Sequence, residues 1–227
     1  MKIRAITHKD LGPITNINEG AFKDDELNAF FYPGKDKYPG DLRRYQILRL
    51  RTRFVTKGMH GVVVETEGDK PEIAGYAMNL RLGDDEEAGK WMEDSWGCAL
   101  ERTLLKLEGW YDRTFTDRAR SSKNIQRFQT ASGWNSLDVY KNRWHISILA
   151  VSPAHQRRGV GAMLVQHAQR LAAEDRVPLT LESSMMGKAM YMKQGLEVVS
   201  EVNVAEGFDS ICMAWVPEGL EGIRERV

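Results

Sequence analysis

Three polar side chains and two glycines lie together in the last third of the chain, in a pattern that can bind an anion. The stretch reads Gln156-Arg157-Arg158-Gly159-Val160-Gly161-Ala162. Glycines let the backbone turn tightly, and they let an anion approach without a Cβ in the way. The two arginines add positive charge and hydrogen-bond donors beside the turn. The stretch therefore predicts a backbone cradle for phosphate oxygens.

The elements on either side of this stretch must hold the cradle in place. Trp144 to Val151 is an apolar run that ends before Ser152-Pro153, which predicts a strand. Residues 161–175 form a predicted helix whose inward face consists of Leu164, Ala168, Leu171 and Ala172. The N-terminus of that helix offers unbonded N–H groups and the positive end of a dipole, which together attract phosphate.

Other phosphate-binding motifs are excluded by the residues that follow. No Gly-Lys-Ser/Thr follows, so the stretch is not a P-loop. Ala162 and Met163 come next where a dinucleotide fingerprint needs a third glycine. Taken alone, two glycines at this spacing are equally typical of an ordinary turn between a strand and a helix.

The rest of the chain predicts a mixed α/β fold with a hairpin near each end. Expected strands cover residues 3–6, 60–66, 73–80, 179–183, 198–204 and 210–216. Expected helices cover residues 11–21, 41–55 and 186–194. Thr7 and Asp10 have the spacing of a capping box before the first helix. Pro-Gly pairs mark turns within residues 22–40, so we expect that segment to be irregular.

Residues 83–143 form a long polar insert. An apolar stripe in it predicts a helix with one buried face, made of Trp96, Leu100, Leu104, Leu107 and Tyr111. The spacing of Trp91, Trp96 and Trp110 is more typical of a core than of an aromatic cage. Residues 118–123 carry charges without an apolar stripe, so we expect them to be exposed. Nothing here is typical of a linker, so we expect one domain over residues 1–227.

Composition excludes several classes of protein. The 227 residues include 32 basic and 32 acidic side chains, so the formal net charge is zero and no general field draws the chain to nucleic acid or an anionic membrane. The N-terminus lacks the apolar core of a secretory signal, and no apolar run approaches the roughly 20 residues that span a bilayer. Two cysteines, Cys98 and Cys212, make no disulfide framework, and the histidine spacing makes no metal cluster. We expect a cytoplasmic protein without a metal, nucleic-acid or membrane partner.

The residues 156–162 resemble the Q/R-x-x-G-x-G/A signature of the GCN5-related N-acetyltransferases, the GNAT superfamily. Residues 149–153 resemble the strand and Val-x-Pro exit before that signature, residues 179–182 the next strand, and residues 189–196 the A-x-x-Y-x-x-x-G-F-type ending. Residues 73–77 are similar to the central hairpin strand. The resemblance is strong over 144–200, loose over 1–80 and absent over 83–143. The Phe-Tyr-Pro-Gly stretch at 31–34 and the long insert resemble a fungal-type subgroup.

This resemblance implies a GNAT-like α/β fold: a mixed, twisted sheet of about seven strands, flanked by helices, with a long helical insert. It also implies acetyl-CoA as the donor. The pyrophosphate would lie on the backbone N–H groups of 156–162. The pantetheine arm would pair like an added strand with Leu149, Ala150 and Val151. In the family this strand splays from its parallel neighbour, and the acetyl group lies in the gap, where a backbone N–H near Ala150 would polarise the thioester carbonyl.

Two residues are candidates for proton transfer. The resemblance puts Tyr191 near the thioester sulfur, where a phenol with a pKa of about 10 can donate to a leaving thiolate. Without the resemblance, Tyr191 is more typical of a core aromatic. Glu182 resembles a strand glutamate that some members use as the general base, and it is equally typical of a polar strand end. Other candidate bases are Glu65, Glu67, His145 and a water positioned by Ser147.

We therefore expect an N-acetyltransferase in which an amine attacks acetyl-CoA directly. Residues 22–55 and 83–143 can cover a pocket, which favours a small-molecule amine. Acetylation of protein N-termini or lysines is an alternative that needs an open groove. A module that binds acyl-CoA without catalysis is another. We expect a monomer or a homodimer.

Overall fold

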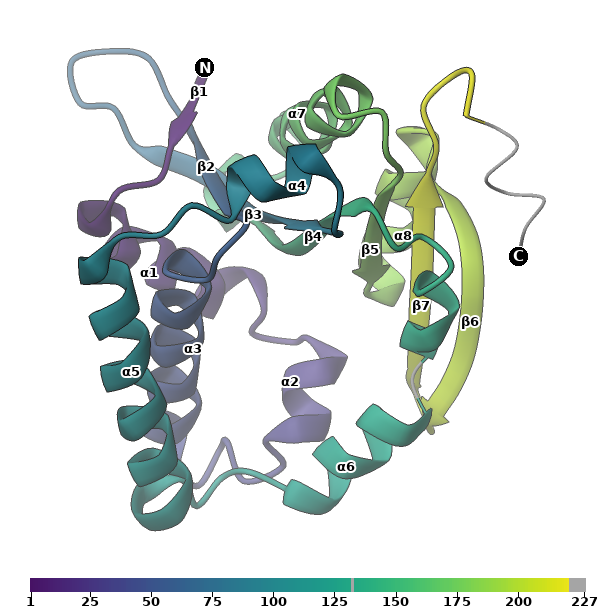
Figure 1. Ribbon diagram of the computed structural model, residues 1–227. Coiled ribbons are helices and arrows are strands. Elements are labelled where there is room, and N and C mark those ends of the chain that lie inside the picture. The colour runs from purple at the N-terminus through teal and green to yellow at the C-terminus, as the bar shows by residue number, and fades with distance from the viewer. Residues whose placement is uncertain (132, 221–227) are drawn as a thin grey trace.

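Seven strands form one mixed sheet in the order β1-β2-β3-β4-β5-β7-β6 (Figure 1). The computed structural model describes residues 1–131 and 133–220. The strands are β1 (Lys2–Ala5), β2 (Met59–Glu65), β3 (Ile73–Leu82), β4 (Arg143–Val151), β5 (Leu179–Ser183), β6 (Glu197–Ala205) and β7 (Phe208–Trp215). All neighbouring strands are antiparallel except β4 and β5. The predicted mixed sheet of about seven strands is therefore confirmed.

Helices lie on both faces of this sheet (Figure 1). They are α1 (Leu11–Ala21), α2 (Glu26–Phe31), α3 (Pro39–Phe54), α4 (Glu86–Trp91), α5 (Trp96–Tyr111), α6 (Ser122–Ala131), α7 (Val160–Glu174) and α8 (Met185–Lys193). Because parallel strands need a crossover connection, α7 joins β4 to β5. None of the described helices is long and apolar enough to cross a membrane.

Local sequence signals explain where several helices begin. Thr7 and Asp10 form the predicted capping box, and Asp10 also accepts hydrogen bonds from Arg4 at 2.8 and 2.9 Å. Ser184 caps α8 by accepting the N–H of Gly187. The expectation that residues 22–40 are irregular is wrong in part, because Asp25 caps the short helix α2 within them. The Pro-Gly pairs favoured a prediction of turns here, so the capping signal of Asp25 was overlooked.

The core lies between the sheet and α7 on one side. Trp144, Leu179 and Met213 belong to the larger buried cluster and are fully covered. Three of the four residues predicted to face inward from α7 are buried, Leu164, Ala168 and Ala172. The fourth, Leu171, packs partly buried against the same cluster. Helical periodicity was sufficient to predict the buried face of α7 because the helix packs on the sheet.

The apolar stripe of α5 is exposed, which contradicts the expectation of a buried face. Its residues are 54–94% exposed: Trp96, Leu100, Leu104, Leu107 and Tyr111. The buried residues are Leu105 and Gly109 instead. Gly109 lets the helix approach α3 closely, since a Cβ there would stand 3.3 Å from Leu48 Cδ2. Trp110 is exposed too, whereas Trp91 packs edge-on against Trp144 as predicted.

The insert is fixed to α3 by charged side chains. Asp41, which is 1% exposed, accepts from Arg44 Nη2 at 2.5 Å and from the backbone N–H of Arg118 at 2.8 Å. Arg44 Nε also bonds Asp112 at 3.2 Å. Ala119 is buried. The expectation that residues 118–123 are exposed is therefore wrong in part: Arg118 and Lys123 are exposed, but Ala119 is buried and the backbone N–H of Arg118 closes this network.

Candidate active site

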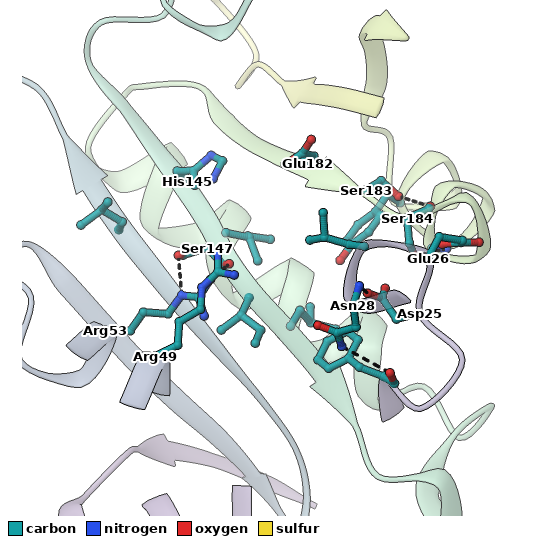
Figure 2. A pocket seen from close by; sticks show the side chains of 18 of the residues that line it. Asp25, Glu26, Asn28, Arg49, Arg53, His145, Ser147, Glu182, Ser183 and Ser184 are labelled. Atoms are coloured by element: carbon teal, nitrogen blue, oxygen red, sulfur yellow. Dashed lines mark hydrogen bonds between the residues drawn. The ribbon is translucent and has the colours of Figure 1, made fainter. Parts of the chain in front are cut away.

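A pocket of about 590 Å³ opens where β4 and β5 part (Figure 2). Its walls come from α1, α2, α3, β4, β5, α8 and the start of β7. The strands pair only from Trp144–Leu179 to Ile146–Leu181. Beyond that point β4 continues to Val151 and β5 to Ser183 without pairing to each other. The splayed strand that the family resemblance implied is thus present.

A bulge in β4 lies where the gap begins. Asn79 pairs with Ile146 and Met78 with Ile148, so Ser147 is the extra residue of β4. A bulge bends a strand and redirects its side chains. Arg53 of α3 bonds this residue twice, from Nε to Ser147 Oγ at 3.0 Å and from Nη2 to Ser147 O at 3.1 Å (Figure 2). The bulge and α3 together hold the gap open on this side.

Glu182 is the first residue of β5 beyond the paired segment, and it lines the pocket. Its Oε1 accepts a hydrogen bond from Ser210 Oγ at 2.5 Å. Cys212 lies opposite on β7, where burial and then the Glu182 charge raise the pKa of the thiol to about 11. Glu182 is therefore a half-buried carboxylate held by β7 at the pocket wall.

Tyr191 lies on α8 and contributes to the same wall. It is 8% exposed, and its ring passes over Gly187, where a Cβ would stand 3.1 Å from Tyr191 Cε2. Burial raises the pKa of its phenol to about 12. A phenol of that pKa stays protonated near neutral pH and can act as a proton donor.

Of the other candidate bases, only those on β4 line the pocket. His145 Nδ1 lies 3.1 Å from Thr180 Oγ1, and burial, with Arg143 and Arg53, lowers the pKa of the imidazole to about 4. Glu65 pairs with Arg4 at 3.0 Å, and Glu67 pairs with the N-terminal ammonium at 2.6 Å. Both glutamates are absent from the pocket lining. The structure therefore removes Glu65 and Glu67 from the candidate bases and keeps His145 and Ser147.

The predicted phosphate cradle lies at the N-terminus of α7. Arg157 and Gly159 are both in the left-handed region, with φ of 59° and 82°. A Cβ at Gly159 would meet nothing within 4 Å, so the space above it is open. Gln156, Arg157 and Arg158 are exposed, whereas Val160 is buried as the helix begins. Backbone N–H groups in such a turn point toward a common anion.

The strand before the cradle presents backbone groups to the gap. Ser152 N–H donates to Ala74 O at 2.9 Å across the ladder with β3. Bonded and non-bonded pairs alternate in an antiparallel ladder, so Ala150 is bonded toward β3. Leu149 and Val151 therefore direct their N–H and C=O groups toward the gap. Consistent with this, Gln156 Nε2 lies 3.4 Å from Val151 O.

Cradle and pocket meet at α8. Leu149, Glu182 and Tyr191 line the pocket, while the other predicted donor-binding residues lie outside it: Ala150, Val151, Gln156, Arg157, Arg158, Gly159, Val160, Gly161 and Ala162. A Cβ at Gly161 would stand 3.6 Å from Met190 Cε. Met190 itself lines the pocket. A donor bound along the cradle and the β4 edge thus reaches the pocket beside Met190 and Tyr191.

The expectation that residues 22–55 cover a pocket is confirmed, but sequence reasoning did not single out the side chains that line it from there. Arg49 and Arg53 reach it from α3, and Asp25, Glu26 and Asn28 reach it from α2 (Figure 2). The arginines stand four residues apart in a segment already interpreted as a basic helix, and that spacing was the signal. Asp25 gave a capping signal only. Among the described residues, no group of three histidines, cysteines or acids could hold a metal ion.

Comparison with known proteins finds a matching family model and a similar acetyltransferase. Residues 129–217 match the family model of the acetyltransferase (GNAT) domain. An acetyltransferase from Stachybotrys chartarum is 22% identical over 209 residues, which cover 92% of this chain and 85% of that protein.

Two solved structures share the fold. One, from Corynebacterium glutamicum, is described as histone acetyltransferase HPA2 and related acetyltransferase; it has a TM-score of 0.60 and 16% identity over 95% of this chain and 96% of that chain. The PaiA N-acetyltransferase from Thermoplasma acidophilum, in complex with coenzyme A, has a TM-score of 0.54 and 11% identity over 95% of this chain and 98% of that chain. GNAT acetyltransferases take their acetyl group from acetyl-CoA. The signature and the splayed strands both lie within residues 129–217, the segment that matches the family model of the acetyltransferase (GNAT) domain.

Proposed function

We propose that this protein transfers the acetyl group of acetyl-CoA to the amine of a small molecule, by direct attack of that amine. One observation carries the proposal: the gap between β4 and β5 opens onto a pocket whose wall includes both Tyr191 and Glu182. A binding module has no need for a proton donor and a carboxylate at the same gap.

The donor side of the chain fits acetyl-CoA. The open turn at Arg157 and Gly159 and the first N–H groups of α7 suit its phosphates. The outward N–H and C=O groups of Leu149 and Val151 suit an amide-bearing pantetheine arm, which can pair with them as a strand does. Bound in this way, the donor supplies a thioester carbonyl carbon as the electrophile.

The proton transfers can be assigned to two side chains. Glu182 accepts the proton that the attacking amine loses, directly or through one water. The new C–N bond forms as the C–S bond breaks, and the electron pair of that bond leaves with sulfur. Tyr191 donates its phenolic proton to that sulfur, so coenzyme A departs as a thiol. No covalent acyl-enzyme is needed, and Tyr191 regains its proton from solvent.

The size of the pocket favours a small acceptor. A volume of about 590 Å³ lies within the roughly 300–1,000 Å³ of small-molecule sites. Helices α2 and α3 cover it from outside, whereas a protein substrate needs an open groove. We propose a cytoplasmic location for the reaction. One experiment distinguishes this proposal from the two alternatives, acetylation of proteins and acyl-CoA binding without catalysis.

That experiment follows thiol release from acetyl-CoA over a panel of small amines and of peptides with free N-termini or lysines. The proposal expects thiol release with at least one class of small amine and little with peptides. Faster release with peptides supports protein acetylation. Saturable coenzyme A binding with no release for any acceptor supports a binding module.

A further inference from the structure

We propose that the acceptor is an amine that also carries an oxyanion, a carboxylate in the first instance, which Arg49 and Arg53 bind on the α3 wall of the pocket. This inference names the acceptor class and rests on the proposed transfer to an amine.

The two arginines lie one helical turn apart and both line the pocket. Residues four apart on a helix are neighbours, and like charges at that spacing repel. Figure 2 shows both side chains directed from α3 toward β4 and Ser147. A pair of guanidinium groups is the side-chain arrangement best suited to a planar oxyanion, because each can donate two parallel hydrogen bonds.

Neither arginine forms an ion pair within the described residues. Arg49 Nη1 donates to the hydroxyl of Tyr45 at 2.7 Å, and Arg53 donates to Ser147. These partners are neutral. Other arginines of the same helix differ: Arg43 pairs with Glu19, Arg44 with Asp41, and Arg51 with Glu108. The pocket-facing pair therefore stands out from the outward-facing arginines by its lack of a counter-charge.

Holding Arg53 and Arg49 together without an opposite charge is electrostatically unfavourable. Burial, and then the neighbouring Arg49, lower the pKa of Arg53 to about 9. A buried charge without an opposite charge is unfavourable, and a pair of like charges adds to that. The bonds to Ser147 explain why Arg53 lies at the β4 bulge, but they give no reason for Arg49 beside it. A bound oxyanion would supply the missing counter-charge and offset the repulsion between the two arginines.

The opposite wall of the pocket carries the acids. Glu182 lies across from the arginines, and Asp25 and Glu26 lie at the start of α2 (Figure 2). An ammonium group is attracted to the acid side and a carboxylate to the arginine side. A ligand with both groups satisfies both walls, and its nitrogen then lies beside Glu182, the proposed base. Amino acids have this chemistry, whereas simple alkylamines and polyamines do not.

Matched acceptors test this inference. We would measure kcat/KM with phenylalanine against phenethylamine, tryptophan against tryptamine, and phosphoethanolamine against ethanolamine. The inference expects the acid-bearing member to be preferred by roughly tenfold or more, since hydrogen bonds between charged groups are among the strongest. Preference in the first two pairs indicates a carboxylate, and preference in the last alone indicates a phosphate. Equal or better activity of the amines without an acid overturns the inference.

Two variants assign the preference to the arginines. Arg49→Gln removes a charge and keeps a hydrogen-bond donor, and it should lower kcat/KM for phenylalanine far more than for phenethylamine, so that most of the preference is lost. Arg51→Gln, on the same helix but paired with Glu108 outside the pocket, is the matched control and should keep the preference. Equal loss of rate with both members of a pair would contradict an oxyanion contact.

A binding measurement separates this inference from the proposed function. With coenzyme A present, calorimetry compares phenylpropionate with phenylpropanol, which have no amine. Stronger binding of the acid that Arg49→Gln weakens supports the oxyanion site, even if no amine is ever acetylated. Acetylation of amines without such acid-specific binding supports the proposed function and overturns this inference.

Discussion

Tyr191 has two properties that a proton donor to a leaving thiolate needs. It lies on the pocket wall, and burial keeps its phenol protonated by raising the pKa to about 12. An ordinary tyrosine, with a pKa of about 10, would begin to lose its proton in mildly alkaline solution. Here the raised pKa means that the donor form persists to higher pH, so alkaline conditions that deprotonate the amine do not remove the acid.

Tyr191→Phe should therefore lower kcat by ~10²–10⁴-fold, the usual range for general acid catalysis, while binding of coenzyme A stays nearly unchanged. The ratio of wild-type to variant kcat should be constant between about pH 7 and pH 10, because the phenol does not titrate there. Steady-state rates across this range, with coenzyme A affinity from calorimetry, provide the measurement. A variant with full activity would make Tyr191 a packing residue of α8.

Glu182→Gln tests the base and keeps the size and the bond with Ser210. If Glu182 accepts the proton, kcat/KM should fall most near neutral pH and recover in part at high pH, where more free amine exists. The part of the acidic limb that reports protonation of the base should disappear, and the part set by protonation of the amine itself should remain. Ser210→Ala is the control, because it removes the partner hydroxyl and leaves the carboxylate. An unchanged profile for Glu182→Gln would direct attention to His145 or to a water held by Ser147.

At this scale the sequence revealed part of the site. Tyr191 and Glu182 were found through the family resemblance of the segments that follow the signature, which form β5 and α8. Arg49 and Arg53 precede it by about a hundred residues, so their approach to Ser147 depends on how α3 packs on the sheet. Glu65 was an attractive carboxylate in the sequence, but it pairs with Arg4 across β1 and β2.

The N-terminus of α7 is the element on which donor binding depends in this account. Gly159 has φ of 82°, and a Cβ there meets no atom within 4 Å. A valine would fit the space but would resist the left-handed backbone by about 1–2 kcal/mol. The turn would then change and move its N–H groups away from a shared anion.

Gly159→Val should therefore weaken coenzyme A binding by roughly tenfold or more, which corresponds to about 1.4 kcal/mol. Gly207→Val is the matched control, since Gly207 also has positive φ, 73°, and open space, but lies in the β6–β7 turn. Isothermal titration of both variants, with circular dichroism to check folding, gives the comparison. Equal losses of coenzyme A affinity in the two folded variants would contradict a specific role for the turn at Gly159 in donor binding.

Helix α5 shows why periodicity alone misleads. Its five-residue stripe has the spacing of a core face, but the buried residues of the helix are Leu105 and Gly109, and Gly109 lies against Leu48 of α3. A repeat of apolar residues identifies a helix face without saying whether another element covers it. For α7 the same reasoning succeeded, because the strands on both sides of it fix the helix over the sheet.

Leu105→Ala should lower the free energy of unfolding by about 2–5 kcal/mol, because Leu105 is 3% exposed. Leu104→Ala, at the adjacent position of the stripe and 54% exposed, should change it by about 0.5 kcal/mol or less. The free energies of unfolding of the two variants in urea show which face of α5 is buried, the face of Leu105 or the face of Leu104. A larger loss for Leu104→Ala than for Leu105→Ala would restore the face that the sequence predicted.

At the scale of the molecule, donor and acceptor functions divide along the chain. The segment that matches the family model, residues 129–217, supplies the cradle, the gap, Glu182 and Tyr191. Helices α1, α2 and α3 supply much of the remaining pocket wall. The glycine signature and the family resemblance around it pointed to the first part. The second part depends on long-range packing, such as Asp41 joining α3 to the insert, and that packing leaves little trace in a single sequence.

The central claim is that acetyl passes directly from acetyl-CoA to an amine nitrogen. The most direct measurement supplies acetyl-CoA labelled with ¹³C in the acetyl group, together with the amine that gives the fastest thiol release. Mass spectrometry and NMR then locate the label. The account predicts one labelled N-acetyl product for each thiol released, with no label on the protein and little as free acetate. Label retained on the protein, or released only as acetate, would contradict direct transfer.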